Sequence, residues 1–438
     1  MNVWLRRAAG WLAAIGLVGC GDPPTSIVLV TVDTLRADHL GSYGYFRDTS
    51  PHLDRLASES LLFENAYATS SNTLPSHVSI LTSTYPARHG VEGNFRFYKH
   101  PLATDDSLQS MAQRLRAAGF DTAAFTSASA LAEPSGVAAG FASFYGTPPY
   151  DSVKQRTEFR AEQTVSAALE WLSTAAAPFF LWLHVFDPHL PYAAPAPYQD
   201  FFATSPELHA FMRERRIPRH LAGAANAYDD EIRYADAQLG RLFERLRELG
   251  PVAIVVTADH GEGLGQHRHE KHSEIWNEQL RVPLIVHLPN GYRGRRTDLA
   301  STVDIFPTLS GALNLHLDFG SSDGIDLLAG SRSHLVSQTP VSIEQPRADY
   351  AIVGSSIDDT VLRHWKLRTR KDGRHQLFDV AADPHELSNL ASARPATRSE
   401  LKRNLDDILS ASRSHPRLAP RELTPEEREA IRALGYAE

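Results

Sequence analysis

Three aspartates each stand at the end of an apolar run with the composition of a buried strand. Asp33 follows IVLVTV, Asp187 follows FFLWLHVF, and Asp259 comes just after VAIVVT. A single aspartate in such a place is usually a turn residue or a helix cap. Three of them are better explained by a metal centre, because three histidines lie close by in the sequence: His189, His260 and His272. Carboxylates and imidazoles suit zinc, manganese, magnesium or calcium, so the ligand types predict one or two divalent metals of open identity.

Thr73 supplies a hydroxyl that can act as a nucleophile. Pro75 is typical of the first turn of a helix, and His77, Ile80 and Leu81 continue at helical spacing. Thr73 then lies at a helix N-terminus, where unpaired N–H groups and the helix dipole hold an anion such as phosphate or sulfate. A threonine hydroxyl becomes reactive only when a metal or a base activates it. On this segment alone, the alternative that Thr73 merely caps the helix is the better explanation.

The elements that must position these groups alternate between strand and helix from Ile27 onward. Helical patterns cover 107–118, 161–174 and 226–250, and a further strand covers 282–286. This alternation predicts an α/β fold with a large, mostly parallel sheet flanked by helices. In such sheets the carboxyl ends of the strands form the ligand-binding edge, so we expect the three aspartates to converge there. Short strand patterns after about Ile352 predict a small C-terminal antiparallel sheet, followed by a last helix over 424–434.

The order of the motifs resembles the active-site pattern of a known family. The run TLPSH, which begins at Thr73, is followed by LT and YPARHG, and the tail contains LFDVAADPHELSNLA. With Asp33 and the Asp259-His260 pair, these phrases resemble the sulfatase family, within the alkaline phosphatase superfamily. The resemblance runs from Ile27 almost to the C-terminus. Two positions differ, because the family signature has Cys or Ser, the precursor of formylglycine, where Thr73 stands, and Arg where His77 stands.

The resemblance implies roles for most of the candidate residues. It implies four ligands for one metal: Asp33, Asp259, His260 and the Thr73 hydroxyl. Phosphatases and phosphodiesterases of the superfamily hold a second metal through one Asp and two His, which implies three further candidates: Asp187, His189 and His272. The spacing Asp187-Pro188-His189 instead resembles the sulfatase arrangement, in which that histidine contacts the substrate anion. One metal, with His189 and His272 as anion contacts, is therefore an open alternative.

Two further residues are candidates for binding the anionic group. Asn94 lies where phosphodiesterases and phosphonate hydrolases of the superfamily place an amide donor to a non-bridging oxygen, and a fixed donor there stabilises developing charge. Without the resemblance, Asn94 would be interpreted as a turn residue after Gly93. The run QHRHEKH from Gln266 to His272 is polar and solvated in pattern, and within it we select His272 and Lys271 as anion contacts.

Composition and the N-terminus bound the class of protein. The 438 residues are 42% hydrophobic and 22% charged, with a net charge of −8 that argues against a nucleic-acid surface. Residues 1–20 pair Arg6 and Arg7 with a short apolar run and end in LVGC, which resembles a bacterial lipoprotein signal. Cys20 is the only cysteine, so we expect it to be lipidated rather than paired, although an incidental cysteine after a plain signal is the alternative.

These observations predict an exported, membrane-anchored hydrolase that faces the periplasm or the exterior, on the inner or the outer membrane. The predicted parts are the signal over 1–20, a tether over 21–26, a catalytic domain over 27–340 and a C-terminal subdomain over 341–438. Thr73 cannot become formylglycine, because its extra methyl group would give a ketone. We therefore expect hydrolysis of phosphate or phosphonate esters, with sulfate esters next. Alternatives are a phospho-alcohol transferase acting on lipids or glycans, and a catalytically silent binding protein.

Overall fold

The computed structural model describes residues 25–94, 108–147, 158–320, 322–340, 348–358, 361–412 and 425. These residues form an eight-stranded sheet in the order β4-β3-β5-β1-β6-β7-β2-β8. Its strands are β1 (Ser26–Val32), β2 (Leu61–Tyr67), β3 (Asp121–Phe125), β4 (Ser143–Tyr145), β5 (Phe179–Val185), β6 (Val252–Ala258), β7 (Leu284–His287) and β8 (Gly294–Ser301). Every neighbouring pair is parallel except the two that involve β7, so the predicted large, mostly parallel sheet is confirmed.

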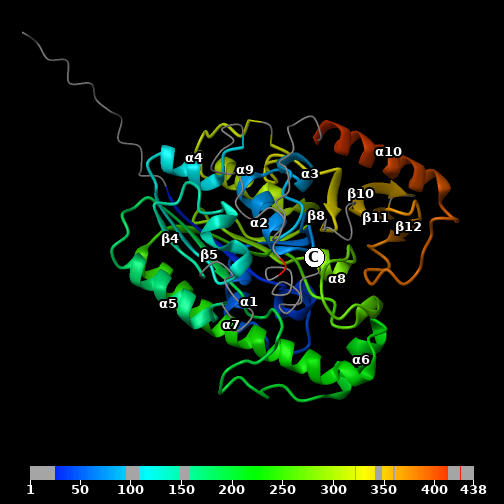
Figure 1. The fold of residues 1–438 in the computed structure, drawn as a ribbon, viewed down its shortest axis with the longest axis horizontal. Coiled ribbons are helices and arrows are strands. Elements are labelled where there is room, and N and C mark those ends of the chain that lie inside the picture. The colour runs from blue at the N-terminus through cyan, green and yellow to red at the C-terminus, as the bar shows by residue number, and fades with distance from the viewer. Residues whose placement is uncertain are drawn as a thin grey trace, which may run out of the picture.

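Helices cover both faces of this sheet (Figure 1). They are α1 (Pro51–Ser58), α2 (Thr73–Thr82), α3 (Pro86–His89), α4 (Met111–Ala117), α5 (Ala161–Leu172), α6 (Pro206–Glu214), α7 (Ala222–Leu249), α8 (Asn277–Leu280), α9 (Ile305–Ala312) and α10 (Pro395–Ser412). α1, α5 and α7 pack on one face, and α2, α4 and α9 pack on the other. None of the described helices is long and apolar enough to cross a membrane.

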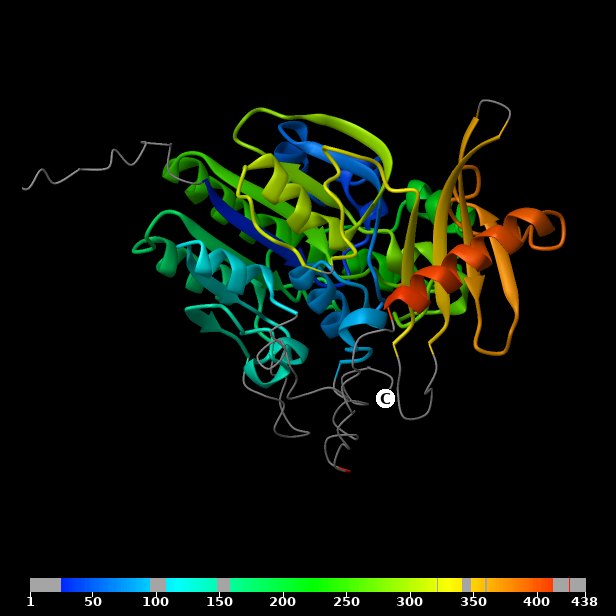
Figure 2. The same cartoon turned by 90° about the horizontal axis from the view of Figure 1, so that it is seen from above.

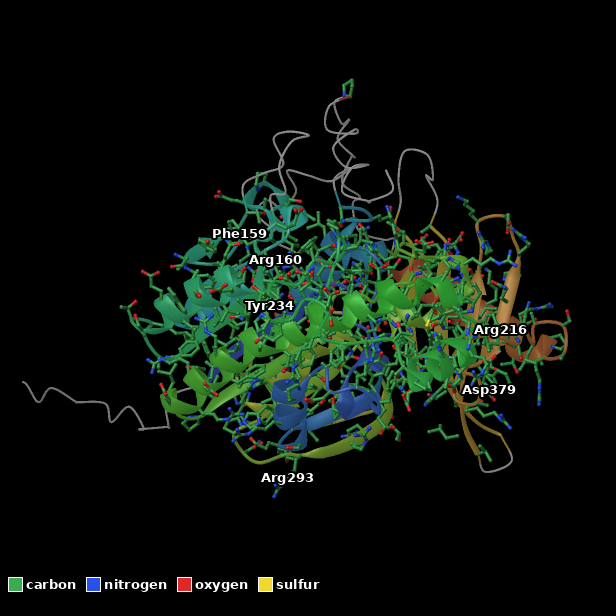
Figure 3. The ribbon with its side chains drawn as sticks, turned by 90° about the horizontal axis from the view of Figure 1, so that it is seen from below. Phe159, Arg160, Arg216, Tyr234, Arg293 and Asp379 are labelled. Carbon is green, nitrogen blue, oxygen red and sulfur yellow. The ribbon has the colours of Figure 1, made fainter. Side chains whose placement is uncertain are left out.

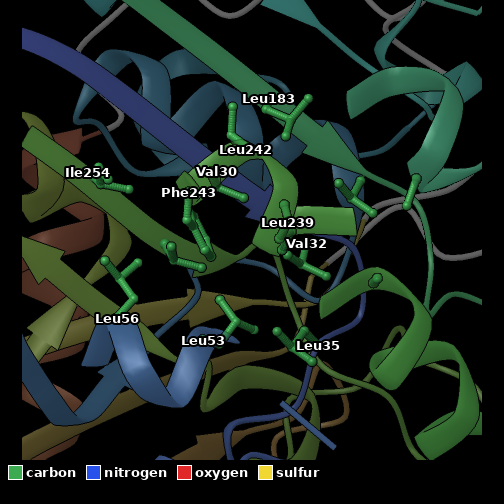
Figure 4. Close-up of a cluster of buried hydrophobic side chains, with 14 of the residues drawn as sticks. Val30, Val32, Leu35, Leu53, Leu56, Leu183, Leu239, Leu242, Phe243 and Ile254 are labelled. Carbon is green, nitrogen blue, oxygen red and sulfur yellow. The ribbon is translucent and has the colours of Figure 1, made fainter. Parts of the chain in front are cut away.

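The central strand β1 shows why both faces must be covered. Its alternate residues Val28, Val30 and Val32 join the core beneath α1, α5 and α7, which Figure 4 shows in part. Ile27 and Leu29 point the other way and join the core beneath α2, α4 and α9. A strand that is apolar on both faces reads as a continuous hydrophobic run, which is the pattern that predicts a buried parallel strand.

A second sheet packs beside the carboxyl ends of the first (Figure 2). It is antiparallel in the order β12-β11-β10-β9, with β9 (His334–Gln338), β10 (Tyr350–Asp358), β11 (Val361–Thr369) and β12 (His375–Asp379), and α10 lies on it. This confirms the predicted small antiparallel sheet. Its first strand begins at His334, so the sheet starts a few residues before the predicted boundary at 340.

Element boundaries differ modestly from the sequence prediction. α4 begins at Met111 rather than 107, because Ser110 and Gln113 form a capping box that starts the helix there. α7 begins at Ala222 rather than 226. The predicted signal over 1–20, most of the tether, and the last helix over 424–434 lie outside the described residues, apart from Pro425.

Candidate active site

The site begins where three neighbouring strands end. β5, β1 and β6 are adjacent and parallel, with Val32 level with Val185 on one side and with Ala258 on the other. Asp33 and Asp259 directly follow β1 and β6 and are completely buried. Their carboxylates and the His260 ring place ligand atoms within 4.8 Å of one another. The predicted convergence at the carboxyl edge therefore occurs for Asp33 and Asp259.

The polar atoms of this trio are arranged as open ligands. Both carboxylate oxygens of Asp33, one of Asp259 and Nε2 of His260 are buried without a hydrogen-bond partner among the described residues. The other oxygen of Asp259 accepts from the backbone N–H of Thr34 at 3.2 Å and of His260 at 2.8 Å. His260 Nδ1 donates to the carbonyl of Gly261 at 3.0 Å, so the lone pair lies on Nε2. Buried polar groups are normally satisfied, so these atoms fit a cation.

The shifted pKa values of Asp33, Asp259 and His260 also indicate a cation site. Burial, followed by the charges of Asp259, Glu262 and Glu158, raises the pKa of Asp33 well above its usual value. Burial raises the pKa of Asp259 to about 6 and lowers that of His260 to about 3. Two buried carboxylates repel each other when both are charged. A bound proton or cation relieves this repulsion, and the neutral imidazole beside them does not. This donor set suits the divalent metals predicted from the sequence, and it leaves their identity open.

Thr73 is the first residue of α2, and Asn72 precedes it as the N-cap without a side-chain cap hydrogen bond. The Thr73 hydroxyl is therefore not a cap, and it is buried with no partner among the described residues. Asn94 lies beside it, because its amide oxygen accepts from the N–H of Leu74 at 2.8 Å. The Asn94 amide nitrogen is buried and unpartnered, so it presents donors that no described group uses.

His77 is held as a neutral ring directly behind Thr73. Its Nδ1 donates to the carbonyl of Thr73 at 2.8 Å, and its Nε2 accepts from the hydroxyl of Thr31 at 3.0 Å. That hydroxyl in turn accepts from Trp182 Nε1 at 3.0 Å. Burial lowers the pKa of His77, so the ring does not replace the positive charge of the arginine that the family signature has here.

His189 and His272 meet next to His260. Their Nε2 atoms lie 3.2 Å apart, and the rings of His260 and His272 have centroids 4.4 Å apart. Each Nδ1 faces a carbonyl oxygen, that of Leu190 at 2.6 Å and that of Ser71 at 3.0 Å, so each lone pair lies on Nε2. Such contacts fix the tautomer of a metal-binding histidine. Lys271 is exposed on the same segment.

Asp187 does not join this group. One carboxylate oxygen accepts from Arg160 Nη1 at 2.7 Å and the other accepts from the N–H of Ala161 at 2.8 Å. Through these two contacts Asp187 anchors the start of α5. No group of potential metal ligands among the described residues includes Asp187, so its predicted second-metal role stays a prediction.

His184 belongs to the site although the sequence reasoning missed it. It is completely buried near the end of β5, and its Nε2 lies 3.5 Å from a carboxylate oxygen of Asp33. Its Nδ1 faces Ser127, whose N–H and hydroxyl lie at 3.5 and 3.4 Å, so the proton sits on Nε2. The available signal was a histidine inside an otherwise apolar strand, FFLWLHV.

A second group of potential ligands, formed by His77, His184 and Asp259, is a poorer metal site. His77 uses Nδ1 to donate to Thr73, so it has no lone pair on that atom to offer. His184 accepts from Ser127 through Nδ1 and carries its proton on Nε2, so Nε2 offers no lone pair. We therefore interpret both rings as residues that orient Thr73 and Asp33.

Comparison with known proteins agrees with this geometry. A family model described as Sulfatase matches residues 25–315. An ulvan-active sulfatase from Formosa agariphila is 24% identical over 420 residues, covering 84% of this chain and 78% of that protein. A choline-sulfatase from Rhizobium meliloti is 25% identical and covers 78% of this chain and 77% of its own length.

Solved structures share the fold. The phosphonate monoester hydrolase of Agrobacterium radiobacter has a TM-score of 0.70 at 20% identity, over 89% of this chain and 96% of that one. A 2-O GAG sulfatase has a TM-score of 0.70 at 18% identity, over 93% and 99%. Since the family model spans most of the chain and the relatives align along most of its length, the protein belongs to the sulfatase family and is an ester-hydrolysing enzyme.

Proposed function

We propose that the protein is a metal-dependent hydrolase of phosphate or phosphonate esters that uses Thr73 as its nucleophile. The observation that carries this proposal is the unpartnered Thr73 hydroxyl at the start of α2, beside a buried trio with unpartnered ligand atoms. A threonine cannot supply the aldehyde hydrate on which formylglycine sulfatases depend. Direct attack by its hydroxyl is the chemistry left to this position, and it suits a phosphoryl centre.

The residues of the proposed site have different roles in the reaction. Asp33, Asp259, His260 and the Thr73 hydroxyl would hold a divalent cation, which when bound lowers the pKa of that hydroxyl and offsets the charge of the ester. Thr73 Oγ attacks phosphorus, the bond to the leaving alcohol breaks, and water then hydrolyses the phosphothreonine. The Asn94 amide nitrogen donates to a non-bridging oxygen.

We propose a single cation in this site, with His189 and His272 contacting the anionic ester. The reason is that Asp187, the only carboxylate predicted for a second ion, is bonded to Arg160 and Ala161. The test is metal analysis of the purified chain, in which one equivalent per protein supports the proposal. Two equivalents, with the second lost in H189A or H272A, would instead support a two-metal centre.

The decisive experiment measures hydrolysis of matched aryl phosphate monoester, phosphodiester, phosphonate and sulfate esters. It uses the protein after metal removal and after readdition. T73A should lose at least about 10³-fold in kcat, whereas T73S, which keeps a hydroxyl, should retain measurable activity. Activity that persists in T73A would refute Thr73 as nucleophile, and activity that survives metal removal would refute the cation.

Sulfate ester hydrolysis is the second candidate, and the curated relatives favour it. The ulvan-active sulfatase and the choline-sulfatase align with most of this chain, and both act on sulfate esters by name. The same site would transfer the sulfuryl group to Thr73. If the sulfate ester is the best of the matched aryl substrates and T73A abolishes its cleavage, this candidate replaces the first.

A further inference from the structure

The chain enters the large sheet at the edge opposite the candidate active site. The central strand β1 begins at Ser26, level with Val252 at the start of β6, and it leads directly to Asp33. Asp33 follows Ser26 by seven residues, so the two lie about 23 Å apart along the strand. Figure 2 shows the start of β1, in dark blue, on the side of the molecule away from the small antiparallel sheet. We call the edge where the parallel strands begin the amino edge.

The segment between the predicted lipid anchor and the amino edge is short. Only residues 21–25 separate Cys20 from Ser26. A chain of this length spans at most about 22 Å when fully extended. It is no longer than β1 itself, so it cannot pass around the outside of the domain to the carboxyl edge. A lipid on Cys20 would therefore hold the amino edge, and not the active site, against a membrane.

Two loops flank the point where the chain enters the sheet. The first joins α7 to β6, whose Val252 is level with Ser26. The second covers 288–293 and joins β7 to β8. It leaves β7 toward the amino edge, because β7 is antiparallel to β6 and its last residue, His287, pairs with Ile254. Both loops therefore lie beside the chain entry.

Exposed apolar and cationic side chains gather in these loops and in the last turn of α7. Leu249 is 38% exposed and Tyr292 is 55% exposed. Arg247 and Arg293 are exposed as well, and neither forms an ion pair with a residue that the structure describes. Figure 3 shows Arg293 extending away from the body of the protein. We call these four residues the amino-edge patch.

The composition of the amino-edge patch suits an anionic membrane surface. Tyrosine is enriched where a protein meets the headgroup region, and arginines near the surface are attracted to anionic lipids. The acidic residue beside Arg247 does not neutralise it, because Glu248 pairs with Arg245 at 3.0 Å. Glu64 likewise pairs with Arg295 at 2.6 Å. The two arginines of the patch are thus available to lipid headgroups.

We propose that the amino-edge patch lies on the membrane to which Cys20 is anchored, and that the active site opens away from that membrane. The substrates are then esters that are dissolved in the surrounding medium or carried on a polymer there, and not esters of membrane lipids. This inference rests on the predicted lipidation of Cys20 and, for the substrate class, on the proposed function. It argues against the alternative of a transferase that acts on lipids.

Energy transfer from a dye on the protein to acceptors on lipid headgroups tests the orientation. Cys20 is the only cysteine and would carry the lipid, so a single new cysteine in the full chain is labelled alone. S58C places the dye at the exposed end of α1, just before β2 begins at the amino edge. E270C places it at an exposed position two residues before His272. The vesicles contain phosphatidylglycerol and phosphatidylcholine.

The dye in S58C should show at least about twofold more energy transfer than the dye in E270C, because the two edges of the sheet are about 23 Å apart along β1. Equal or greater transfer from E270C would overturn the inference. Absence of transfer from both positions would also overturn it, since the chain would then not be held at the membrane.

The two arginines test the contact between the patch and the lipid. In S58C protein, R247Q/R293Q should lose about half of the transfer in these vesicles and none in vesicles of phosphatidylcholine alone. The control R213Q/R219Q removes two exposed arginines before the start of α7 and should change the transfer in neither kind of vesicle. Equal losses in the two variants would show that net charge, and not the patch, attracts the lipid.

Hydrolysis tests the substrate class separately. Lipidated wild type in the same vesicles receives an aryl phosphodiester that is either dissolved in the buffer or attached to a diacylglycerol in the bilayer. The dissolved ester should be cleaved at least about tenfold faster, because a short tether cannot bring the site to the bilayer. Detergent removes the bilayer and should abolish this difference.

Equal or faster cleavage of the bilayer ester would overturn the inference. A difference that persists in detergent would overturn the substrate assignment, because the leaving group would then explain it. If neither ester is cleaved, the proposed function fails, whereas the orientation is still decided by the energy transfer, which does not depend on catalysis.

Discussion

Single side chains in the site differ in how their polar atoms are satisfied. His189, His260 and His272 each use Nδ1 to donate to a backbone carbonyl, which leaves the lone pair on Nε2. In His77, by contrast, Nδ1 donates to the carbonyl of Thr73 and Nε2 accepts from the hydroxyl of Thr31. The backbone therefore decides which histidines can bind a cation or an anionic substrate, because it fixes the tautomer of each ring.

Substitution of Asp33 alone tests whether the site binds the proposed cation. Replacing Asp33 with Asn removes a carboxylate whose pKa is raised by burial and then by the charge of Asp259. In metal-free protein we expect D33N to increase the free energy of unfolding by about 1–3 kcal/mol. With excess metal the order should reverse, because only wild type gains stability from binding. Urea unfolding with and without chelator measures both, and a metal-free D33N that is less stable than wild type would contradict this account.

Substitution of Asn94 tests whether its amide nitrogen donates to the ester oxygens. Asn94→Asp keeps the oxygen that accepts from Leu74 and removes the unpartnered amide nitrogen. We expect kcat to fall about 10²-fold, the usual effect of losing one such donor, with little change in thermal stability. Steady-state kinetics beside circular dichroism check this. A variant with wild-type kcat would mean that Asn94 only shapes the turn.

At the scale of elements, one arginine joins three of them around the segment that carries His189. Arg160, at the start of α5, contacts Asp187 after β5 at 2.7 Å, Glu231 on α7 at 3.2 Å and the carbonyl of Ala193 at 2.6 Å. Figure 3 shows Arg160 beside Tyr234 of α7, whose hydroxyl accepts from the N–H of Glu162 at 3.2 Å. Through these contacts Arg160 ties the end of β5 to α5 and α7.

Arg160→Ala should strongly destabilise the contact between Asp187 after β5 and Glu231 on α7. It leaves Asp187 and Glu231 facing each other, and burial with the charge of Asp187 already raises the pKa of Glu231 to about 7. We expect a loss of about 3 kcal/mol in the free energy of unfolding, and E231Q should restore part of it in the double variant. Arg241→Ala, on an exposed part of α7, is the control and should change stability by less than about 0.5 kcal/mol. Equal effects of the two substitutions on urea unfolding would contradict the proposed stabilising role of Arg160.

The connection from α2 to α3 predicts how stability depends on pH. His89 accepts from the N–H of Val91 at 3.1 Å through Nδ1 and contacts the Ser79 hydroxyl at 3.0 Å through Nε2. Burial lowers its pKa from 6.5 to about 3, so the folded state resists protonation and the unfolded state does not.

The stability that comes from neutral His89 is therefore complete above pH 6.5 and is lost as pH falls from 6.5 toward 3. In H89Q the slope of unfolding free energy against pH should be smaller by up to about 1.4 kcal/mol per pH unit in that window. Urea midpoints at pH 7.5, 6, 5 and 4 give the slope for each protein. Parallel slopes would show that His89 is protonated in the folded state.

At the scale of the whole molecule, the second sheet supports the active-site edge of the first. Lys366 on β11 is completely buried and bonds Asn277 of α8 at 2.9 Å and Glu386 at 3.0 Å. Arg368, two residues on, lies over the ring of Trp276, just before α8. These contacts hold the chain that leads from His272 to β7, so the small sheet fixes a wall of the site.

The N-terminal sequence makes a prediction for the whole molecule that concerns location. We propose that Cys20 is lipidated and anchors the enzyme to a membrane, since the residues before it have the pattern of a lipoprotein signal. Cys20→Ser should move the protein from the membrane fraction to the soluble fraction of fractionated cells while its ester hydrolysis continues. Retention of the serine variant in the membrane fraction would contradict the anchor.

The sequence by itself determined the class of fold and the candidate residues. Uninterrupted apolar runs predict parallel strands, and strands that end in Asp33 and Asp259 place those residues at one edge whatever the loops do. Pro75 likewise predicts the helix that begins at Thr73. These inferences succeed because they depend on local periodicity and on a general property of parallel sheets.

Only the tertiary structure decided what each polar atom does. Asp187 bonds Arg160, and His184 lies 3.5 Å from Asp33, both through contacts between different elements. A hydrogen bond depends on the direction and distance of two groups within a few tenths of an ångström, and packing of whole elements sets that geometry. Residue type and spacing alone do not contain it, because the partner belongs to another element.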